Sequence, residues 1–246
     1  MGKSVIIIPS RLEAKRLPNK PLLEINNIPI IIHVMNRAKE SNIGEVFVAT
    51  PDEEIFNLVK KNSGNSILTK NDHPTGTDRV FEAYQKIKDK EIDLVINLQG
   101  DMPNVEPTNI LKLNELMKKT DGKIGTLASK ISKQDELKDK NIVKVRTKKS
   151  LNIGNFLEAE DFFRIKNLKE NRNIYHHLGI YAFKPSILEK FINLKRSKNE
   201  IERNLEQLRA LDSGIKIDVA LTSSLPLSVD TKEDLEKVRL LMNLKK

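Results

Sequence analysis

Short apolar runs and longer amphipathic segments alternate along the first 130 residues of the chain. The runs are rich in Val, Ile and Leu and favour strands, whereas the apolar residues of the longer segments recur at helical spacing. Strands are expected at residues 4–9, 45–50, 66–68, 94–98 and 123–129, with helices at 30–40, 52–62, 78–89 and 108–119. This order predicts an α/β fold with a mostly parallel central sheet, flanking helices and right-handed crossovers.

The alternation is interrupted near residue 141. Strand-like residues 142–147 and 175–183 enclose a charged stretch with little periodicity, which favours an insertion over another strand-helix-strand unit. Regular patterning returns with helices at 185–194 and 201–211, a strand at 216–221 and a final helix. With 246 residues of which 38% are hydrophobic, we predict one domain, residues 1–246, that contains a smaller lobe at about 141–215.

Composition excludes several kinds of chemistry. The chain has no Cys, which removes disulfides, thiol nucleophiles and thiolate zinc sites, and leaves oxygen ligands or its 4 His for any metal. No signal peptide or spanning segment is recognisable, so a soluble, cytoplasmic protein is expected. The net charge of +9 suggests nucleic-acid binding as a hypothesis. Aromatic residues make up only 4% of the chain, however, and they form no pattern on which bases could stack. A basic protein that handles nucleotides, without nucleic-acid or membrane partners, is the simpler interpretation.

A cationic loop follows the first strand. It carries Arg11, Lys15, Arg16 and Lys20 at the carboxyl end of that strand, where ligands of open α/β sheets bind. Several phosphate charges could be met there together. The spacing matches neither the P-loop nor the dinucleotide-binding glycine pattern, and a solvated basic loop remains the alternative.

Two further loops carry polar residues at strand or helix ends. Asp101 follows the apolar residues 94–98, a position that suits Mg²⁺, although Gly-Asp with a nearby Pro is also ordinary turn chemistry. In residues 72–79, Thr77 is a candidate N-cap and Gly76 would let a ligand approach the backbone. Capping alone would explain Thr77.

The last helix begins with a capping pattern. Thr231 and Asp234 can satisfy each other's backbone N–H groups, which gives this segment a structural role. Asp230 lies just outside the cap and is free to point elsewhere. If it faces Asp101, the two carboxylates complete a metal site.

Taken in order, these segments resemble the 3-deoxy-manno-octulosonate cytidylyltransferase (CMP-Kdo synthetase) family. The resemblance covers essentially the whole chain and runs through I-P-x-R-L-x-x-x-R-L-P-x-K-P-L at 8–22, H-x-[ST]-G-T-[DE]-R at 73–79, Q-G-D-x-P at 99–103, H-L-G-I-Y at 177–181, L-E-Q-L-R at 205–209 and V-D-T-x-E-D-L at 229–235. It implies a Rossmann-like nucleotidyltransferase fold, a homodimer, with the lobe also serving dimerisation, and Mg²⁺ dependence. The implied reaction transfers CMP from CTP to 3-deoxy-D-manno-octulosonate (Kdo) and releases pyrophosphate, for lipopolysaccharide synthesis.

The resemblance also assigns roles to single residues. Catalytic roles fall on Arg11, Lys20, Asp101 and Asp230, with Asp101 and Asp230 as the metal ligands. The implied nucleotide-binding residues are Pro9, Ser10, Arg11, Arg16, Lys20, Thr69, Gly76 and Thr77. The implied sugar-binding residues are Arg79, Gln99, His177, Tyr181, Glu206, Gln207 and Arg209. Strand alternation would put His177 and Tyr181 on one face. Arg209 could instead serve an ion pair between its helix and the sheet.

Four positions depart from the family pattern, namely Met102, Glu158, His176 and Arg203. They bear on the sugar more than on CTP, because Glu158 stands where the family usually has Arg, and a reversed charge changes which ligand is favoured. A related sugar acid, such as 8-amino-Kdo or a sialic-acid-like substrate, is therefore an alternative acceptor, as is another sugar or alcohol phosphate. A non-catalytic nucleotide-binding relative is a third possibility.

Overall fold

The computed structural model describes residues 2–13, 16–89, 91–132, 134–165 and 173–244. By its internal contacts the chain divides into two compact units. Unit 1 comprises residues 1–111 and 226–246, and unit 2 comprises residues 112–225. Within the described residues, none of the helices is long and apolar enough to cross a lipid bilayer.

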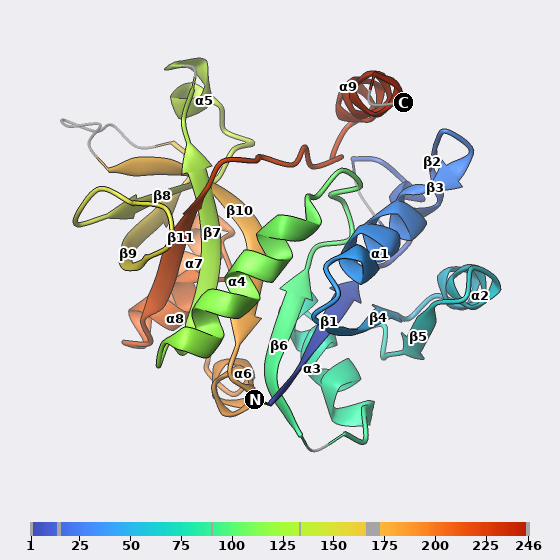
Figure 1. The fold of residues 1–246 in the computed structure, drawn as a ribbon, viewed down its shortest axis with the longest axis horizontal. Coiled ribbons are helices and arrows are strands. Elements are labelled where there is room, and N and C mark those ends of the chain that lie inside the picture. Colours follow the sequence, from blue (N-terminus) through green and yellow to red (C-terminus); the bar gives the residue numbers. More distant parts are fainter. Residues whose placement is uncertain (1, 14–15, 90, 133, 166–172, 245–246) are drawn as a thin grey trace. The chain divides into compact units, whose positions relative to one another are not determined.

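Unit 1 is built on four parallel strands (Figure 1). Their order is β5 (Asn65–Leu68), β4 (Gly44–Thr50), β1 (Lys3–Pro9) and β6 (Ile92–Leu98). Residues Val5 to Ile8 of β1 are completely buried, as expected for a strand flanked on both edges and covered on both faces. The helices between these strands are α1 (Ile30–Glu40), α2 (Glu53–Lys61) and α3 (Gly76–Lys86). The predicted parallel α/β architecture is confirmed in this unit.

Smaller elements complete unit 1. A turn of 3-10 helix, η1 (Lys20–Leu22), precedes the hairpin of β2 (Glu24–Ile25) and β3 (Ile28–Pro29). The sequence analysis missed this hairpin, although its two Asn residues with positive φ are the signal of a two-residue turn. The C-terminal helix α9 (Lys232–Asn243) returns to this unit, and α4 (Pro107–Lys119) runs across the division between residues 111 and 112.

Unit 2 is mainly antiparallel. Its strands follow the order β10 (Ile174–Phe183), β7 (Ile124–Lys130), β11 (Ile217–Thr222), β9 (Phe156–Phe163) and β8 (Lys144–Thr147). Only β7 and β11 pair in parallel. Because β8 also pairs with the first residues of β10, the five strands curl into a partly closed ring. The helices are α5 (Gln134–Lys138), α6 (Pro185–Ile192), α7 (Lys198–Arg203) and α8 (Leu208–Asp212).

Unit 2 differs from expectation in two elements. Strand β9 lies in the stretch that had no clear periodicity, because its exposed and buried residues do not alternate regularly. The single helix expected at 201–211 is two short helices, α7 and α8. They are separated at Asn204, whose left-handed backbone (φ 51°) ends α7. Unit 2 spans residues 112–225, and the prediction of one domain with a smaller lobe at about 141–215 stays a prediction.

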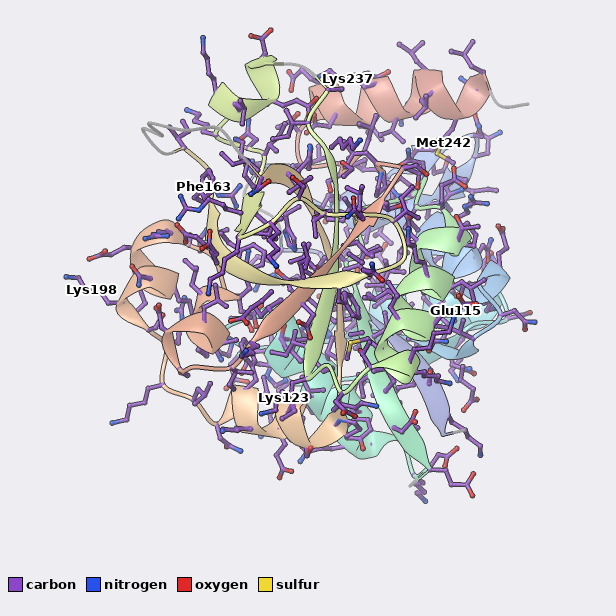
Figure 2. The ribbon with its side chains drawn as sticks, turned by 60° about the vertical axis from the view of Figure 1, so that its left-hand side comes forward. Glu115, Lys123, Phe163, Lys198, Lys237 and Met242 are labelled. Atoms are coloured by element: carbon purple, nitrogen blue, oxygen red, sulfur yellow. The ribbon has the colours of Figure 1, made fainter. Side chains whose placement is uncertain are left out.

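The positive charge is concentrated in unit 2. Its sequence holds 24 Lys and Arg against 15 Asp and Glu, whereas unit 1 holds 19 of each. Many of the cations in unit 2 are exposed, such as Lys198 at the start of α7, which points away from the helix (Figure 2). The net charge of +9 is therefore not a property of the unit that contains the cationic loop.

Candidate active site

A cavity of about 590 Å³ opens in unit 1 beyond the carboxyl ends of β1 and β6. Its size is typical of a small-molecule site. Its walls come from the loop after β1, the start of α3, the end of β6 and the segment before α9. Of the predicted site residues, it is lined by Pro9, Ser10, Arg11, Arg16, Lys20, Gly76, Arg79, Gln99, Asp101 and Asp230.

The cationic loop is held by hydrogen bonds at its first residues, 10–12, which we call its neck. Ser10 N donates to Ala49 O over 2.9 Å, and Leu12 N donates to Asp52 Oδ2 over 2.8 Å. The carbonyl oxygen of Leu12 accepts a hydrogen bond from Asn19 N, which closes the loop on itself. Arg11, Arg16 and Lys20 are thereby held on one side of the cavity, while Lys15 lies outside the described residues.

Lys20 joins the two predicted metal ligands. Its Nζ lies 3.1 Å from Asp101 Oδ2 and 3.2 Å from Asp230 Oδ1, so the ammonium group bridges both carboxylates. Burial disfavours the charged form of Lys20, but the attraction of Asp101 and Asp230 outweighs it and raises the pKa of the ammonium group. Arg16 also reaches Asp230 over 3.0 Å.

Backbone contacts explain how residues so distant in sequence meet. Val229 N donates to Asp101 O over 2.9 Å, which ties the segment before α9 to the end of β6. The capping box of Thr231 and Asp234 is present as predicted and sets the start of α9 directly after Asp230. At Gly100 an added Cβ would lie 3.0 Å from Pro9 O, so a larger residue would push the acidic loop away from β1.

The acid pair fits a hard divalent cation. In the described part of the chain no group of three or more His, Cys, Asp and Glu residues is arranged to hold a metal. Mg²⁺ does not need such a cage, since it binds through one or two carboxylates and takes water and substrate phosphates as its other ligands. Two carboxylates that already share one cation, beside a cavity lined with Arg and Lys, match that donor set.

Two guanidinium groups face the same part of the cavity. Arg79 is only 3% exposed and donates to Thr69 Oγ1 over 2.5 Å and to Lys70 O over 3.0 Å. Burial lowers the pKa of Arg79, and the like charge of Arg11 lowers it further, while Asp52 and Glu82 act in the opposite direction. Two cations that repel each other at a cavity wall favour an anionic ligand between them.

The predicted cap of α3 is wrong. The helix begins at Gly76, and Thr75 is the N-cap, with its hydroxyl accepting a hydrogen bond from Asp78 N. Thr77 already lies in the first turn, where its Oγ1 accepts a hydrogen bond from Asn97 Nδ2 over 3.0 Å. Neither Thr69 nor Thr77 lines the cavity, since Thr69 supports the lining residue Arg79 and Thr77 contacts the buried Asn97.

The sequence analysis missed an acidic residue that holds the loop before α3. Glu82 accepts hydrogen bonds from Lys70 N and His73 Nε2 and pairs with Lys86. Burial opposes its ionisation, but the bonds from Lys86, His73 and the Lys70 backbone lower the pKa of Glu82 to about 2. Asp52 was missed in the same way, although its place after β4, at the carboxyl edge of the sheet, is a usable signal.

In unit 2, His177 and Tyr181 share one face of β10, as predicted. Their ring centroids lie 5.4 Å apart, and the His177 ring also meets Phe162 edge-on at 5.0 Å. His177 Nε2 lies 3.0 Å from Thr126 Oγ1, and burial lowers the pKa of His177 to about 3, so the ring is neutral. The Tyr181 hydroxyl is buried and has no hydrogen-bond partner among the residues that the structure describes. Burial together with the charge of Glu206 raises the pKa of Tyr181.

The predicted sugar-binding residues near α8 fall into two groups. Glu206 and Gln207 are half-buried, and Glu206 lies close enough to Tyr181 to act on its ionisation. Arg209 is instead 2% exposed and binds Glu200 through two hydrogen bonds of 2.7 and 2.9 Å, with its guanidinium 4.7 Å from the Phe191 ring centroid. Arg209 forms an ion pair, but the pair joins α7 to α8 and not a helix to the sheet, as the alternative had expected.

The four residues that depart from the family pattern have different surroundings. Met102 is buried, at 2% exposure, and the other three have charged partners. Glu158 pairs with Lys216 over 2.8 Å and lies opposite Asp218 of β11. Along the sheet, Asp218 is three residues away from Leu221, the residue of β11 that is level with His177. His176 contacts Glu136, and Arg203 contacts Asp161. Glu158 thus forms an exposed ion pair with Lys216, and its effect on the choice of sugar stays a prediction.

A parallel α/β unit with a cationic loop and two carboxylates around a cavity at its carboxyl edge defines the nucleotidyltransferase class. The family model described as cytidylyltransferase matches residues 5–217. A 3-deoxy-manno-octulosonate cytidylyltransferase from Rhodopseudomonas palustris (strain BisB18) is 40% identical over 243 residues, which cover 96% of each chain. The chain belongs to the 3-deoxy-manno-octulosonate cytidylyltransferase family.

Other relatives and solved structures agree. The enzyme of the same name from Brucella abortus (strain 2308) is 39% identical over 96% of this chain and 94% of its own. The structure of CMP:2-keto-3-deoxy-manno-octonic acid synthetase complexed with CTP superposes with a TM-score of 0.88 at 36% identity, and covers 99% of this chain and 100% of the other. A UTP-bound UGPase from Acinetobacter baumannii, at 15% identity and a TM-score of 0.71 over 100% of this chain and 95% of its own, shares the fold alone.

Proposed function

We propose that this chain transfers CMP from CTP to Kdo, giving CMP-Kdo and pyrophosphate. The observation that carries the proposal is the convergence of Arg11, Arg16 and Lys20 with Asp101 and Asp230 around one cavity. The names of the relatives, at about 40% identity over nearly the whole chain, and the CTP complex of a similar structure supply the substrates.

The nucleotide side of the site follows from charge. The triphosphate binds to Arg11, Arg16 and Lys20, whose positive charges match its oxygens. Pro9, Ser10 and Gly76 provide backbone that the nucleotide can approach, with Thr69 and Thr77 supporting the wall from behind. Arg79, held in place by Thr69 and Lys70, faces the anionic ligand beside Arg11.

The reaction is an in-line displacement at the α-phosphate. The anomeric hydroxyl oxygen of Kdo forms a bond to that phosphorus while the bond to the β-phosphate oxygen breaks, pyrophosphate leaves, and the hydroxyl proton is released. Arg11, Arg16 and Lys20 hold the reacting groups in line and neutralise charge on the departing oxygens. No protein nucleophile is needed, in agreement with a chain that has no Cys.

Asp101 and Asp230 are the residues that would hold Mg²⁺. When bound there, the cation would neutralise phosphate charge and lower the pKa of an oxygen it coordinates. Lys20 contacts both carboxylates, so the same ammonium group would have to move toward the phosphates when the metal binds.

In unit 1, Arg79 and Gln99 are the proposed sugar-binding residues. In unit 2, taken by itself, His177, Tyr181, Glu206 and Gln207 keep the role that the family resemblance implies. The unpaired buried hydroxyl of Tyr181 and the neutral ring of His177 are groups that can hydrogen-bond sugar hydroxyls. Arg209 is left out of this set, because Glu200 already occupies its guanidinium.

The test is pyrophosphate release in the presence of CTP and Mg²⁺, with Kdo, 8-amino-Kdo and a sialic acid as parallel acceptors. Release with Kdo, and much less with the others, is the expected result. Release only with another acceptor would keep the nucleotidyl transfer and reassign the sugar. CTP binding without release from any acceptor would overturn the proposal in favour of a non-catalytic relative.

Three further expectations accompany this function. A homodimer, a cytoplasmic location and a role in lipopolysaccharide synthesis follow from the family resemblance and stay predictions. Sedimentation of the purified protein with and without CTP would test the first of them.

A further inference from the structure

Asn97 is a buried polar residue without contact with the cavity. It lies on β6 opposite Ile7 of β1, is 1% exposed, and is absent from the cavity lining. A buried side-chain amide must form its hydrogen bonds inside the protein, since an unsatisfied group would cost stability. Its two partners therefore show what this residue does.

The partners of Asn97 connect α3 to the cavity. Its Nδ2 donates to Thr77 Oγ1 over 3.0 Å, and Thr77 is itself 3% exposed. Its Oδ1 accepts a hydrogen bond from Gln99 Nε2 over 3.0 Å. Residues two apart along an extended chain point to the same side, which brings Asn97 and Gln99 together. The result is a chain of three side chains, with Thr77 at the buried end and Gln99 at the cavity.

This chain decides where the acceptor atom of Gln99 lies. With one N–H of Nε2 bound to Asn97, the carbonyl oxygen Oε1 is turned away from Asn97 and is the acceptor that the amide offers, beside the second N–H of Nε2. It lies beside Gly76, where an added Cβ would be 3.9 Å away, and both residues line the cavity. With the Asn97 amide in place, turning the Gln99 amide over would set Oε1 against Asn97 Oδ1, two acceptors with no proton between them.

We propose that Asn97 is a positioning residue that orients the amide of Gln99, so that Gln99 presents a hydrogen-bond acceptor to a hydroxyl group of the acceptor sugar. The identity of the sugar rests on the function proposed above, whereas the orientation of the amide does not. An acceptor oxygen favours hydroxyl donors and disfavours carboxylate or phosphate oxygens, which are met by the guanidinium groups of Arg11 and Arg79 instead. Gln99 would thus recognise the hydroxyl end of the sugar and not its carboxylate end.

Two substitutions of Asn97 separate positioning from simple stability. Asn97→Leu has a similar size but cannot accept from Gln99, so the amide loses its anchor. Asn97→Asp keeps an acceptor for Gln99 Nε2 but buries a carboxylate, which costs more stability. We expect the Leu variant to raise the KM for Kdo about tenfold, the effect of losing one good hydrogen bond, with the KM for CTP changed less than about twofold. The Asp variant should be the less stable protein and yet keep a KM for Kdo closer to wild type.

A double variant tests whether Asn97 acts through Gln99. Gln99→Met should raise the KM for Kdo by a similar factor, and adding Asn97→Leu to it should cause little further change, because the amide is already gone. Additive effects, or a larger rise of the KM for Kdo in the Asp variant than in the Leu variant, would overturn the proposal.

Nuclear magnetic resonance of the ¹⁵N-labelled side-chain amide of Gln99 tests the orientation without any substrate. Its N–H protons should be protected from exchange in the wild type and in Asn97→Asp, and unprotected in Asn97→Leu. Equal protection in all three proteins would refute the positioning role even if the enzyme were active. If wild-type protein fails to use Kdo but shows this protection pattern, only the proposed substrate is wrong.

Discussion

Asp101 and Asp230 converge on one ammonium group, that of Lys20, at 3.1 and 3.2 Å. Asp101 lies in the loop after β6, whereas Asp230 lies in the segment before α9, and the hydrogen bond from Val229 N to Asp101 O joins the two segments. The cluster is nearly neutral in itself, because Arg16 and Lys20 balance both acids. A pair of carboxylates is thus kept together by the cations of Lys20 and Arg16.

Asp101→Asn should remove most of the turnover. The amide retains the shape of the carboxylate but loses the charge that a divalent cation needs, so we expect at least about a hundredfold decrease in pyrophosphate release. The urea midpoint should stay close to that of the wild type, since Asp101 is half-buried and no cavity is made. Asp72→Asn, an exposed position outside the cavity lining, is the matched control. Near-normal turnover of Asp101→Asn would contradict the metal assignment.

Lys20→Gln should bind a divalent cation more tightly than the wild type when no nucleotide is present. Removing the ammonium leaves two carboxylates without their shared counter-ion, so we expect at least about a tenfold decrease in the Kd of Mn²⁺, measured by electron paramagnetic resonance of the free ion. Lys20→Arg keeps the charge and should resemble the wild type. Unchanged Mn²⁺ affinity in Lys20→Gln would show that the acids are not the metal ligands.

Asp52→Ala should weaken CTP binding, although Asp52 is not among the residues that line the cavity. Asp52 holds Leu12 N at the neck of the cationic loop, and a loosened loop presents Arg11 and Arg16 less well, so the KM for CTP should rise about tenfold. Asp52→Asn still offers an oxygen to Leu12 N and should have a smaller effect. Glu53→Ala, the next residue along, serves as the control. Equal effects of the Ala and Asn variants would argue against the hydrogen bond.

Breaking the pair between Glu200 and Arg209 should destabilise unit 2. Both side chains are almost fully buried, at 1% and 2% exposure, but Arg196 also reaches Glu200 over 2.9 Å. Removing Arg209 therefore leaves the carboxylate with one cation, and the loss should be smaller than the roughly 3–5 kcal/mol of a buried charge left without any partner. Arg209→Met should show this in urea unfolding. Glu200→Gln combined with Arg209→Met should recover part of the loss, and a double variant less stable than either single one would count against a paired role.

His177 should make stability depend on pH. Because burial lowers the pKa of His177 to about 3 in the folded protein, against 6.5 in the unfolded chain, only the unfolded state takes up a proton between these values. The free energy of unfolding should therefore fall as the pH decreases below about 6.5, by at most about 1.4 kcal/mol per pH unit from this residue. His177→Gln should flatten the curve between pH 7 and 5. Parallel curves for the two proteins would contradict a buried neutral His.

Much of unit 1 could be predicted from the sequence because its information is local. The period of apolar residues gave the four parallel strands and their helices, and the capping pair Thr231 and Asp234 gave the start of the last helix. Short elements were harder. The hairpin of β2 and β3 has only two residues in each strand, and the break at Asn204 depends on one residue in a left-handed conformation, which few sequence signals mark.

The sequence by itself determined which chemical groups this protein carries and at which strand ends they stand: a cationic loop after β1, one acid after β6 and another before α9. Only the tertiary structure decided which of them meet. It brought Lys20 between Asp101 and Asp230, set Asp52 against Leu12, and joined Thr77, Asn97 and Gln99. It also turned Arg209 inward to Glu200. Periodicity encodes local conformation and burial, whereas contacts between distant residues depend on strand register and on where the chain returns.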